Sequence, residues 1–196
     1  MFSQIEYKIE NTALLDQLRK ALHTDTLTDD ALLSLSDLEI DDPDLTEVKD
    51  LFRLTGLQTL RFASGFQIPS TKFLVSLERL SHLKHLDLSQ TDVDTLFFIE
   101  KLSNLESLRI DGTQIRSLSS LSALTTLTLL TIKNTWIYDL YPLIALTKLS
   151  SLDSRACTLL PVSHQGYFQT RAIVEQVVGC YDNITSFFPL MFRIQY

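Results

Sequence analysis

Residues 86–107 read LDLSQTDVDTLFFIEKLSNLES, and residues 108–129 read LRIDGTQIRSLSSLSALTTLTL. The two stretches are both 22 residues long and carry aliphatic residues at matching positions. The same spacing separates a longer series of leucines, which are Leu86, Leu108, Leu130 and Leu152. It also separates a second recurring slot, filled by Thr91, Thr113, Thr135 and Cys157. Self-similarity at a fixed short period indicates a solenoid of stacked copies of one unit.

Each unit contains two different hydrophobic periods. An alternating Leu-x-Leu or Leu-x-Ile segment comes first, and a period of two is typical of a β-strand. Leucines at every third position follow, and this period suits a tight 3₁₀ turn. One unit cannot bury its own leucines, so stacking is expected to bury a continuous leucine column behind a parallel sheet. In the recurring slot we expect the threonines to hydrogen-bond backbone groups and Cys157 to be a small buried thiol.

The spacing is interrupted once. Leu38 and Leu60 are also 22 residues apart, but 26 residues separate Leu60 from Leu86. The four extra residues fall within residues 64–72, which contain a glycine and a proline. We therefore expect a loop that bulges from the stack in this segment.

The pattern L-x-x-L-x-L-x-x-T-x-I-x-x-L-x-x-L over residues 32–160 resembles 22-residue leucine-rich repeats. It is most similar to those of internalin-type bacterial proteins and of the related phosphatase-regulator branch. The resemblance implies an α/β repeat fold, a solenoid with a parallel concave β-sheet, 3₁₀-like convex turns, a helical N-terminal cap and a mixed C-terminal cap. It assigns residues 1–31 to the helical cap, 32–160 to about six repeats, and 161–196 to the C-terminal cap.

Both ends of the chain carry patterns of their own. Residues 13–22 form an amphipathic helical pattern, and Thr28 is placed to cap a second helix. Residues 170–178 predict a helix, and alternating apolar residues follow from Phe188 to Tyr196. That last segment could cover the leucine column as a strand, or it could pair with another chain. We accordingly expect a monomer, with a weak dimer through the C-terminal strand as the alternative.

Composition excludes several classes of protein. The chain has 196 residues, a formal net charge of -7, 45% hydrophobic residues and 38 leucines. The acidic balance argues against nucleic-acid binding, which depends on positive patches. The first residues lack the pattern of a signal peptide, and no apolar run is long enough for membrane insertion. We expect a cytoplasmic protein, with a secreted effector lacking a cleavable signal as the alternative.

Motifs for chemistry are missing from the sequence. The four histidines and two cysteines show no metal-ligand spacing, and no phosphate-binding or nucleophile-elbow motif occurs. Ser107, His85 and Asp87 could be imagined as a catalytic constellation, but they would lie on an open strand face without a pocket. Asp41, Asp42 and their neighbour Asp44 favour a turn over a loose cation site. We predict no cofactor, no metal and no enzymatic activity.

The repeat register predicts which side chains face out of the concave sheet. The first row is Asp37, Thr59, His85, Ser107, Leu129 and Ser151. The second row is Glu39, Arg61, Asp87, Arg109, Thr131 and Asp153. Neighbouring strands lie about 4.8 Å apart, so the alternating charges of the second row would be in mutual contact range. They could neutralise one another, or they could fix the register of a partner.

Aromatic residues gather in one later repeat. Trp136 occupies the slot that Asp92 and Gln114 hold in other repeats, and Tyr138 follows it. Trp136 could fold onto the neighbouring repeat, or it could anchor a binding hot spot. The predicted protein-binding residues are Arg109, Asp111, Leu129, Thr131, Lys133, Trp136, Tyr138, Asp153 and Arg155.

The function expected from these features is non-enzymatic protein recognition through the concave face. The resemblance implies a bacterial scaffold or an effector-like interaction protein whose partner is another protein. The alternative is a regulatory subunit that docks on an enzyme, such as a phosphatase, and controls it.

Overall fold

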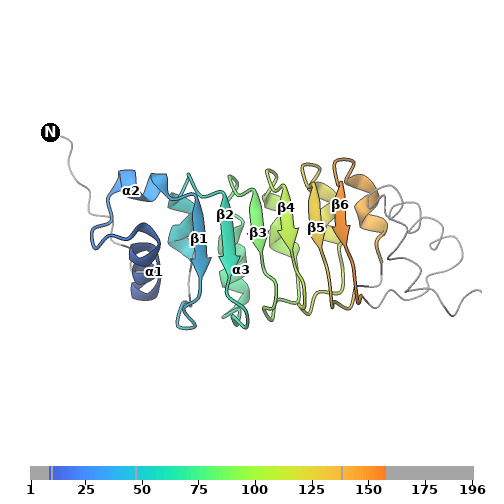
Figure 1. Ribbon diagram of the computed structural model, residues 1–196, viewed down its shortest axis with the longest axis horizontal. Coiled ribbons are helices and arrows are strands. Elements are labelled where there is room, and N and C mark those ends of the chain that lie inside the picture. The colour runs from blue at the N-terminus through green and yellow to red at the C-terminus, as the bar shows by residue number, and fades with distance from the viewer. Residues whose placement is uncertain (1–8, 10, 47, 138, 158–196) are drawn as a thin grey trace, which may run out of the picture.

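A computed structural model describes residue 9 and residues 11–46, 48–137 and 139–157. Six short strands lie side by side along the long axis of the molecule (Figure 1). They are β1 (Asp37–Ile40), β2 (Thr59–Phe62), β3 (His85–Asp87), β4 (Ser107–Arg109), β5 (Leu129–Thr131) and β6 (Ser151–Asp153). Their order in the sheet is their order in the sequence, and every pairing is parallel. The sequence prediction of a parallel sheet of stacked repeats is therefore confirmed.

The register of the sheet follows the leucine spacing. Leu38 pairs with Leu60, Leu60 with Leu86, and the same pairing continues across the remaining strands to Leu152. All of these leucines are buried, with 6% or less of their surface exposed. They form one continuous core together with the leucines of the return turns. Burying each such side chain contributes about 1.5–3 kcal/mol of favourable transfer free energy, which is why the stack needs all its leucines.

The return segments behind the sheet are mostly single 3₁₀ turns, as the three-residue leucine period predicts. They are η1 (Lys49–Arg53), η2 (Phe97–Lys101), η3 (Ser119–Ala123) and η4 (Tyr141–Ala145). The segment that contains Leu74 and Leu77 differs, because it forms the α-helix α3 (Thr71–Leu77). Ser70 caps this helix by accepting a hydrogen bond from the backbone N–H of Phe73. A 3₁₀ turn was the wrong expectation here, because the inserted residues supply a capping serine and enough chain for helical turns.

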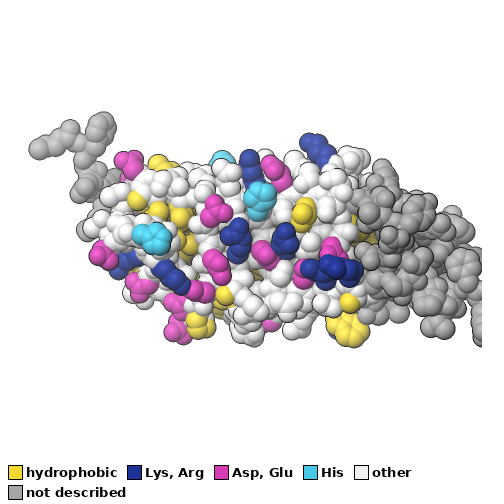
Figure 2. Space-filling view, in the orientation of Figure 1, with side chains coloured by type: hydrophobic (Ala, Val, Ile, Leu, Met, Phe, Trp, Pro, Cys, Tyr) yellow, Lys and Arg dark blue, Asp and Glu magenta, His cyan; other side chains and the backbone are white. Residues whose placement is uncertain are grey.

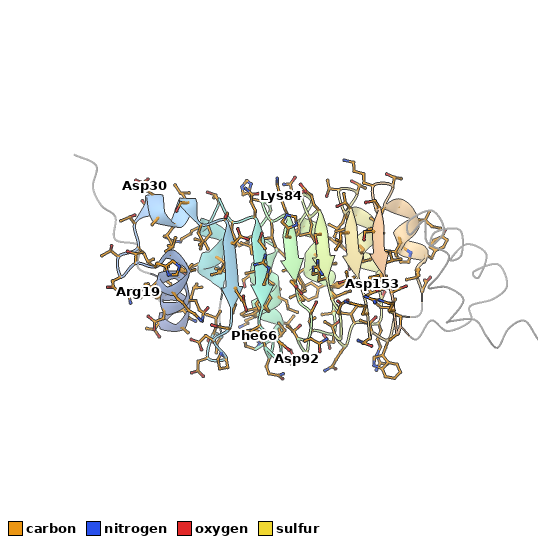
Figure 3. All side chains as sticks on the ribbon, viewed as in Figure 1. Arg19, Asp30, Phe66, Lys84, Asp92 and Asp153 are labelled. Atoms are coloured by element: carbon orange, nitrogen blue, oxygen red, sulfur yellow. The ribbon has the colours of Figure 1, made fainter. Side chains whose placement is uncertain are left out.

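The insertion itself is anchored to the body of the protein. Phe66 is buried and its ring lies 5.2 Å from that of Phe62 and 5.8 Å from that of Phe73. The backbone N–H of Ile68 donates to the Asp92 carboxylate at 2.7 Å. Phe66 and Asp92 lie together at the edge of the sheet where the strands end (Figure 3). Residues 64–70 form a loop as predicted. Most of its residues are exposed, and the buried Phe66 and the partly buried Ile68 hold it to the stack.

The recurring threonine slot stabilises each turn that follows a strand. The hydroxyl groups of Thr91, Thr113 and Thr135 donate to the carbonyl three residues earlier, at 2.6–2.8 Å. Cys157 takes the same place in the last described turn, where its thiol donates to the carbonyl of Ile132. Burial raises the pKa of the Cys157 thiol above its ordinary value. The predicted threonine ladder and the predicted buried thiol are both confirmed.

Two helices precede the sheet. The first is α1 (Thr12–Leu22), capped by Asn11, and the second is α2 (Asp29–Ser34), capped by Thr28 as predicted. Helix α1 packs against β1 and buries Leu14 and Leu18 in the same core as the repeats. The first strand therefore has its leucine face covered. The C-terminal helix and strand expected within residues 161–196 lie outside the described residues.

Candidate protein-binding face

Alternate residues of each strand point away from the leucine core and form one surface, which we call the sheet face. Strand pairing places Asp37, Thr59, His85, Ser107, Leu129 and Ser151 in one row. It places Glu39, Arg61, Asp87, Arg109, Thr131 and Asp153 in a second row. Figure 2 shows basic and acidic side chains interspersed across the middle of this face. Both rows have the membership that the sequence predicts.

A chain of ion pairs crosses the C-terminal half of the sheet face. Lys133 lies between two carboxylates, with its Nζ 3.1 Å from Asp111 Oδ2 and 3.9 Å from Asp153 Oδ2. Asp153 is also bound by Arg155, whose Nε and Nη2 donate to its two oxygens at 2.9 and 2.7 Å. Asp111 is buried and accepts a further hydrogen bond from the backbone N–H of Lys133 at 2.8 Å. Four of the predicted binding residues thus bind one another.

These contacts shift the protonation of Asp153 and Arg155. Hydrogen bonds from Arg155 hold the pKa of the Asp153 carboxyl below its usual value, against the opposing effect of burial. The same hydrogen bond raises the pKa of the Arg155 guanidinium. Both groups are therefore charged at neutral pH. Asp153 and Arg155 can therefore present fixed charges to a partner.

In the N-terminal half of the sheet face, the charged side chains do not pair along the second row in the way that the sequence predicts. Arg61 lies 3.8 Å from Asp37, diagonally across β1 and β2, and makes no ion pair with Glu39 or Asp87. Hydrogen bonds from Ser36 and then Thr59 lower the pKa of Asp37, with a smaller contribution from Arg61. The predicted run of mutual contacts along the second row is therefore wrong among the described residues. The register fixes which strands are neighbours, whereas side-chain direction decides which charges meet.

Three members of the second row, Glu39, Arg109 and Thr131, make no side-chain hydrogen bond or ion pair with a described residue. The guanidinium of Arg109 is exposed and makes no hydrogen bond or ion pair there. The hydroxyl of Thr131 is buried, and it is the only buried side-chain oxygen or nitrogen in the described part of the chain without a hydrogen bond. Thr131 therefore contributes little surface to the face, whereas Arg109 is fully available to a partner.

The aromatic residue singled out in the sequence is accessible. Trp136 exposes 63% of its surface, so it does not fold onto the neighbouring repeat. It follows the turn beyond the end of β5, whereas the half-buried Leu129 begins that strand. The structure thus places Leu129 and Trp136 at opposite ends of one strand. Tyr138 lies outside the described residues.

A shallow hollow of about 190 Å³ opens on the sheet face over β2, β3 and β4. Its lining residues are Thr59, Arg61, His85, Leu86, Asp87, Ser107 and Arg109. The hollow brings together the Ser107, His85 and Asp87 side chains that the sequence analysis considered for catalysis, because β3 pairs with β4. No hydrogen bond joins the three, and such bonds are what an activated nucleophile needs.

Comparisons with known proteins agree with this architecture. The chain is similar to the structure of internalin C2 from Listeria monocytogenes, with 23% sequence identity and a TM-score of 0.60 over 84% of this chain and 79% of that one. It is also similar to a leucine-rich-repeat protein from Leptospira interrogans, with 18% identity and a TM-score of 0.57 over 81% of this chain and 44% of that one. The fold is a leucine-rich-repeat solenoid. No protein-family model and no curated protein matches the chain.

The internalin resemblance predicted from the repeat pattern is thus matched by the structural neighbours. A third neighbour is the internalin InlF from Listeria monocytogenes, with 18% identity and a TM-score of 0.53. The chain covers 61% of InlF, less than its share of internalin C2. At these identities the likeness concerns the fold of the leucine-rich-repeat solenoid, so the site must be argued from this chain's own residues.

Sequence reasoning missed part of the hollow. Arg61, His85 and Ser107 were placed in the outward rows, but they were not among the predicted binding residues. The signal that could have found them is the row register, because it places His85 directly opposite Ser107 and leaves an arginine on each side of Asp87.

The described residues form neither a metal site nor a membrane-spanning helix. No group of three or more histidine, cysteine, aspartate or glutamate side chains there could hold a metal ion. Asp41 is already bound by Gln17 and Lys20, and Asp42 accepts the backbone N–H of Asp44 as a turn. None of the described helices is long and apolar enough to cross a bilayer. The turn predicted from this aspartate cluster is confirmed.

Proposed function

We propose that this leucine-rich-repeat solenoid is a bacterial interaction protein that recognises another protein through its sheet face, without catalysis. Its structural neighbours, internalins and another leucine-rich-repeat protein, support an interaction scaffold in general. A sheet held by a continuous core is a rigid surface, so little conformational entropy is lost when a partner binds. The partner is a folded or extended protein whose polar groups match the charged sheet face.

The exposure of Trp136 is the observation that carries this proposal. Trp136 has 63% of its surface in water, the highest exposed fraction among the large hydrophobic side chains of the described residues, and so leaves a large apolar area unburied. Tryptophan is among the residues most enriched in binding hot spots. The ion-paired residues Asp111, Lys133, Asp153 and Arg155 would form its polar rim, with Arg109 beyond them. Leu129, Thr131 and Tyr138 complete the proposed site.

Affinity purification with the whole chain tests the proposal. Trp136→Ala should lose a protein that the wild type retains from extracts of the source organism or its host. Phe97→Ala is the matched control, because Phe97 is a partly exposed aromatic residue on the return turn η2, behind the sheet. Lys133 is left unchanged, since removing the cation between Asp111 and Asp153 would disturb the fold as well as the face.

The retained protein is then purified, and the amide hydrogen exchange of the complex is measured. We expect protection in β4, β5 and β6 and in the turns that follow these strands. A partner that binds wild type, Trp136→Ala and Phe97→Ala equally would contradict the role of Trp136. Protection confined to α1 and α2 would overturn the sheet face as the binding surface.

A further inference from the structure

The hollow over β2, β3 and β4 has a size and a lining that suit one polar side chain. Its volume of about 190 Å³ lies below the roughly 300–1,000 Å³ typical of small-molecule sites. Apart from Leu86, its lining consists of polar or charged residues. The hollow is therefore too small to enclose a typical metabolite or cofactor. A single side chain from a docked protein would fit.

The charges of the hollow favour an anion. Arg61 and Arg109 lie on β2 and β4, one on each side of β3, and so about 10 Å apart along the row. Arg109 makes no ion pair with any described residue, and the one ion pair of Arg61 is the 3.8 Å approach to Asp37. With Asp87 between them, the hollow has a formal charge of +1 in a chain whose net charge is -7. Complementary charge is what selects a partner at such a position.

Asp87 does not neutralise the two arginines by contact. Its Oδ1 accepts the backbone N–H of Ser89 at 2.9 Å, which directs the carboxylate toward the turn after β3. No ion pair within 4.0 Å joins Asp87 to Arg61 or Arg109 among the described residues. In the C-terminal half, by contrast, Arg155 is bound through two nitrogens to Asp153. The unpaired guanidinium of Arg109 is therefore a property of this hollow and not of every arginine on the face.

The hollow also offers further hydrogen-bond donors. His85 and Ser107 face each other across β3 and β4, and neither side chain makes a hydrogen bond with a described residue. Arginine presents parallel N–H groups that match the two oxygens of a carboxylate. Arg109, Ser107 and His85 together can surround such a group from β3 and β4.

We propose that this hollow binds the carboxylate of an aspartate or glutamate side chain of the protein partner, with Arg109 as the principal donor and Arg61 as the second cation. The proposal rests on the proposed function and names the chemistry of the partner at this position. Trp136 would supply apolar contact at one part of the interface, and the hollow would fix the register at another.

A pair of matched small probes tests this directly. N-acetyl-glutamate amide carries one carboxylate, and N-acetyl-glutamine amide has the same shape without the charge. Each is titrated into the whole chain while the backbone amide signals of residues 59–61, 85–87 and 107–109 are followed by NMR. We expect saturable shifts at these strands with the glutamate probe only. Equal shifts with both probes, or shifts mainly elsewhere, would overturn the proposal.

Two arginine variants separate a specific contact from a general positive field. Arg109→Gln should weaken binding of the glutamate probe by about tenfold, because a charge-assisted hydrogen bond is lost. Arg155→Gln removes the same charge from the paired half of the face and should change binding by less than about twofold. The amide spectra of both variants show whether the fold is retained. An equal loss in the two variants would reject the hollow as the site.

Inorganic phosphate serves as the competing anion. If it binds the hollow more tightly than the glutamate probe, with the same dependence on Arg109, the occupant is a phosphoryl group and the proposed acidic side chain is wrong. These titrations need no partner protein, so their failure leaves the Trp136 experiment standing. If Trp136→Ala retains the partner as well as the wild type does, while the glutamate probe still gives saturable shifts at the hollow, the larger interface is rejected and the carboxylate site stands.

Discussion

The two halves of the sheet face share one scaffold but differ in how their charges are paired. In the C-terminal half, Lys133 joins Asp111 to Asp153, and Arg155 closes on Asp153 through two nitrogens. Around the hollow over β2, β3 and β4, by contrast, Arg61 makes only the 3.8 Å approach to Asp37, and Arg109 makes no ion pair with a described residue. The strand register is the same in both halves. Position in the repeat therefore does not determine whether a charge is satisfied within the protein.

This difference separates two roles that charged residues have on a binding face. A charge already paired contributes modestly to stability and holds its neighbours in place, but a partner must displace a contact to use it. An unpaired charge costs the fold little and is free to bind. We therefore expect substitutions in the paired half to change the free energy of unfolding, and substitutions around Arg109 to change binding.

The largest effect should come from the leucine column that both halves share. Leu130→Ala removes a fully buried side chain and leaves a cavity, so we expect a loss of about 2–5 kcal/mol in the free energy of unfolding. Leu129→Ala is the matched control. Leu129 precedes Leu130 on the same strand and is half-buried on its outer face, so its substitution should lower the free energy of unfolding by less than about 1 kcal/mol. Urea unfolding measures both. Equal losses would mean that the outer face of β5 is as tightly packed as the core.

The features that could be predicted from sequence are those that the repeat spacing determines. Strand positions, their register and the threonine ladder follow from spacing alone, because Leu38, Leu60 and the later leucines must stack to be buried. The helix α3 could not be derived that way. Its start depends on Ser70 as a cap and on the insertion being anchored by Phe66.

Charge pairing was the other part that spacing could not determine. Arg61 has acidic neighbours on both adjacent strands, and adjacency alone favours Glu39 or Asp87 in its own row. The structure shows Arg61 near Asp37 instead, two residues along β1 from its register partner Glu39. A long side chain chooses among several carboxylates by its rotamer and by competing bonds, such as that of Asp87 to the backbone of Ser89. Exposure of Trp136 was likewise one of two open alternatives.

A smaller effect of opposite sign is expected on β5. Thr131→Val replaces a buried hydroxyl that has no partner among the described residues, so we expect the free energy of unfolding to rise by about 1 kcal/mol. Thr135→Val is its matched control, since that hydroxyl donates to the carbonyl of Ile132 at 2.6 Å. The control should lose about 1 kcal/mol. Thermal or urea unfolding gives both signs, and a loss at Thr131 equal to that at Thr135 would show that its hydroxyl is satisfied.

The smallest effect tests the paired half itself. Asp153→Asn removes the carboxylate that Arg155 and Lys133 share, and we expect a loss of about 0.5 kcal/mol near pH 7, the scale of a partly exposed ion pair. Because the pKa of Asp153 is lowered by folding, its stabilising effect is present above the unfolded-state value of about 4 and disappears as the pH falls through the folded-state pKa. The stability difference between wild type and Asp153→Asn should therefore shrink below about pH 4. Glu39→Gln removes an equal charge from β1, where the carboxylate makes no ion pair with a described residue, and should give a difference near zero at pH 7. Equal losses at Asp153 and Glu39 would mean that net charge, and not pairing, distinguishes the two halves of the face.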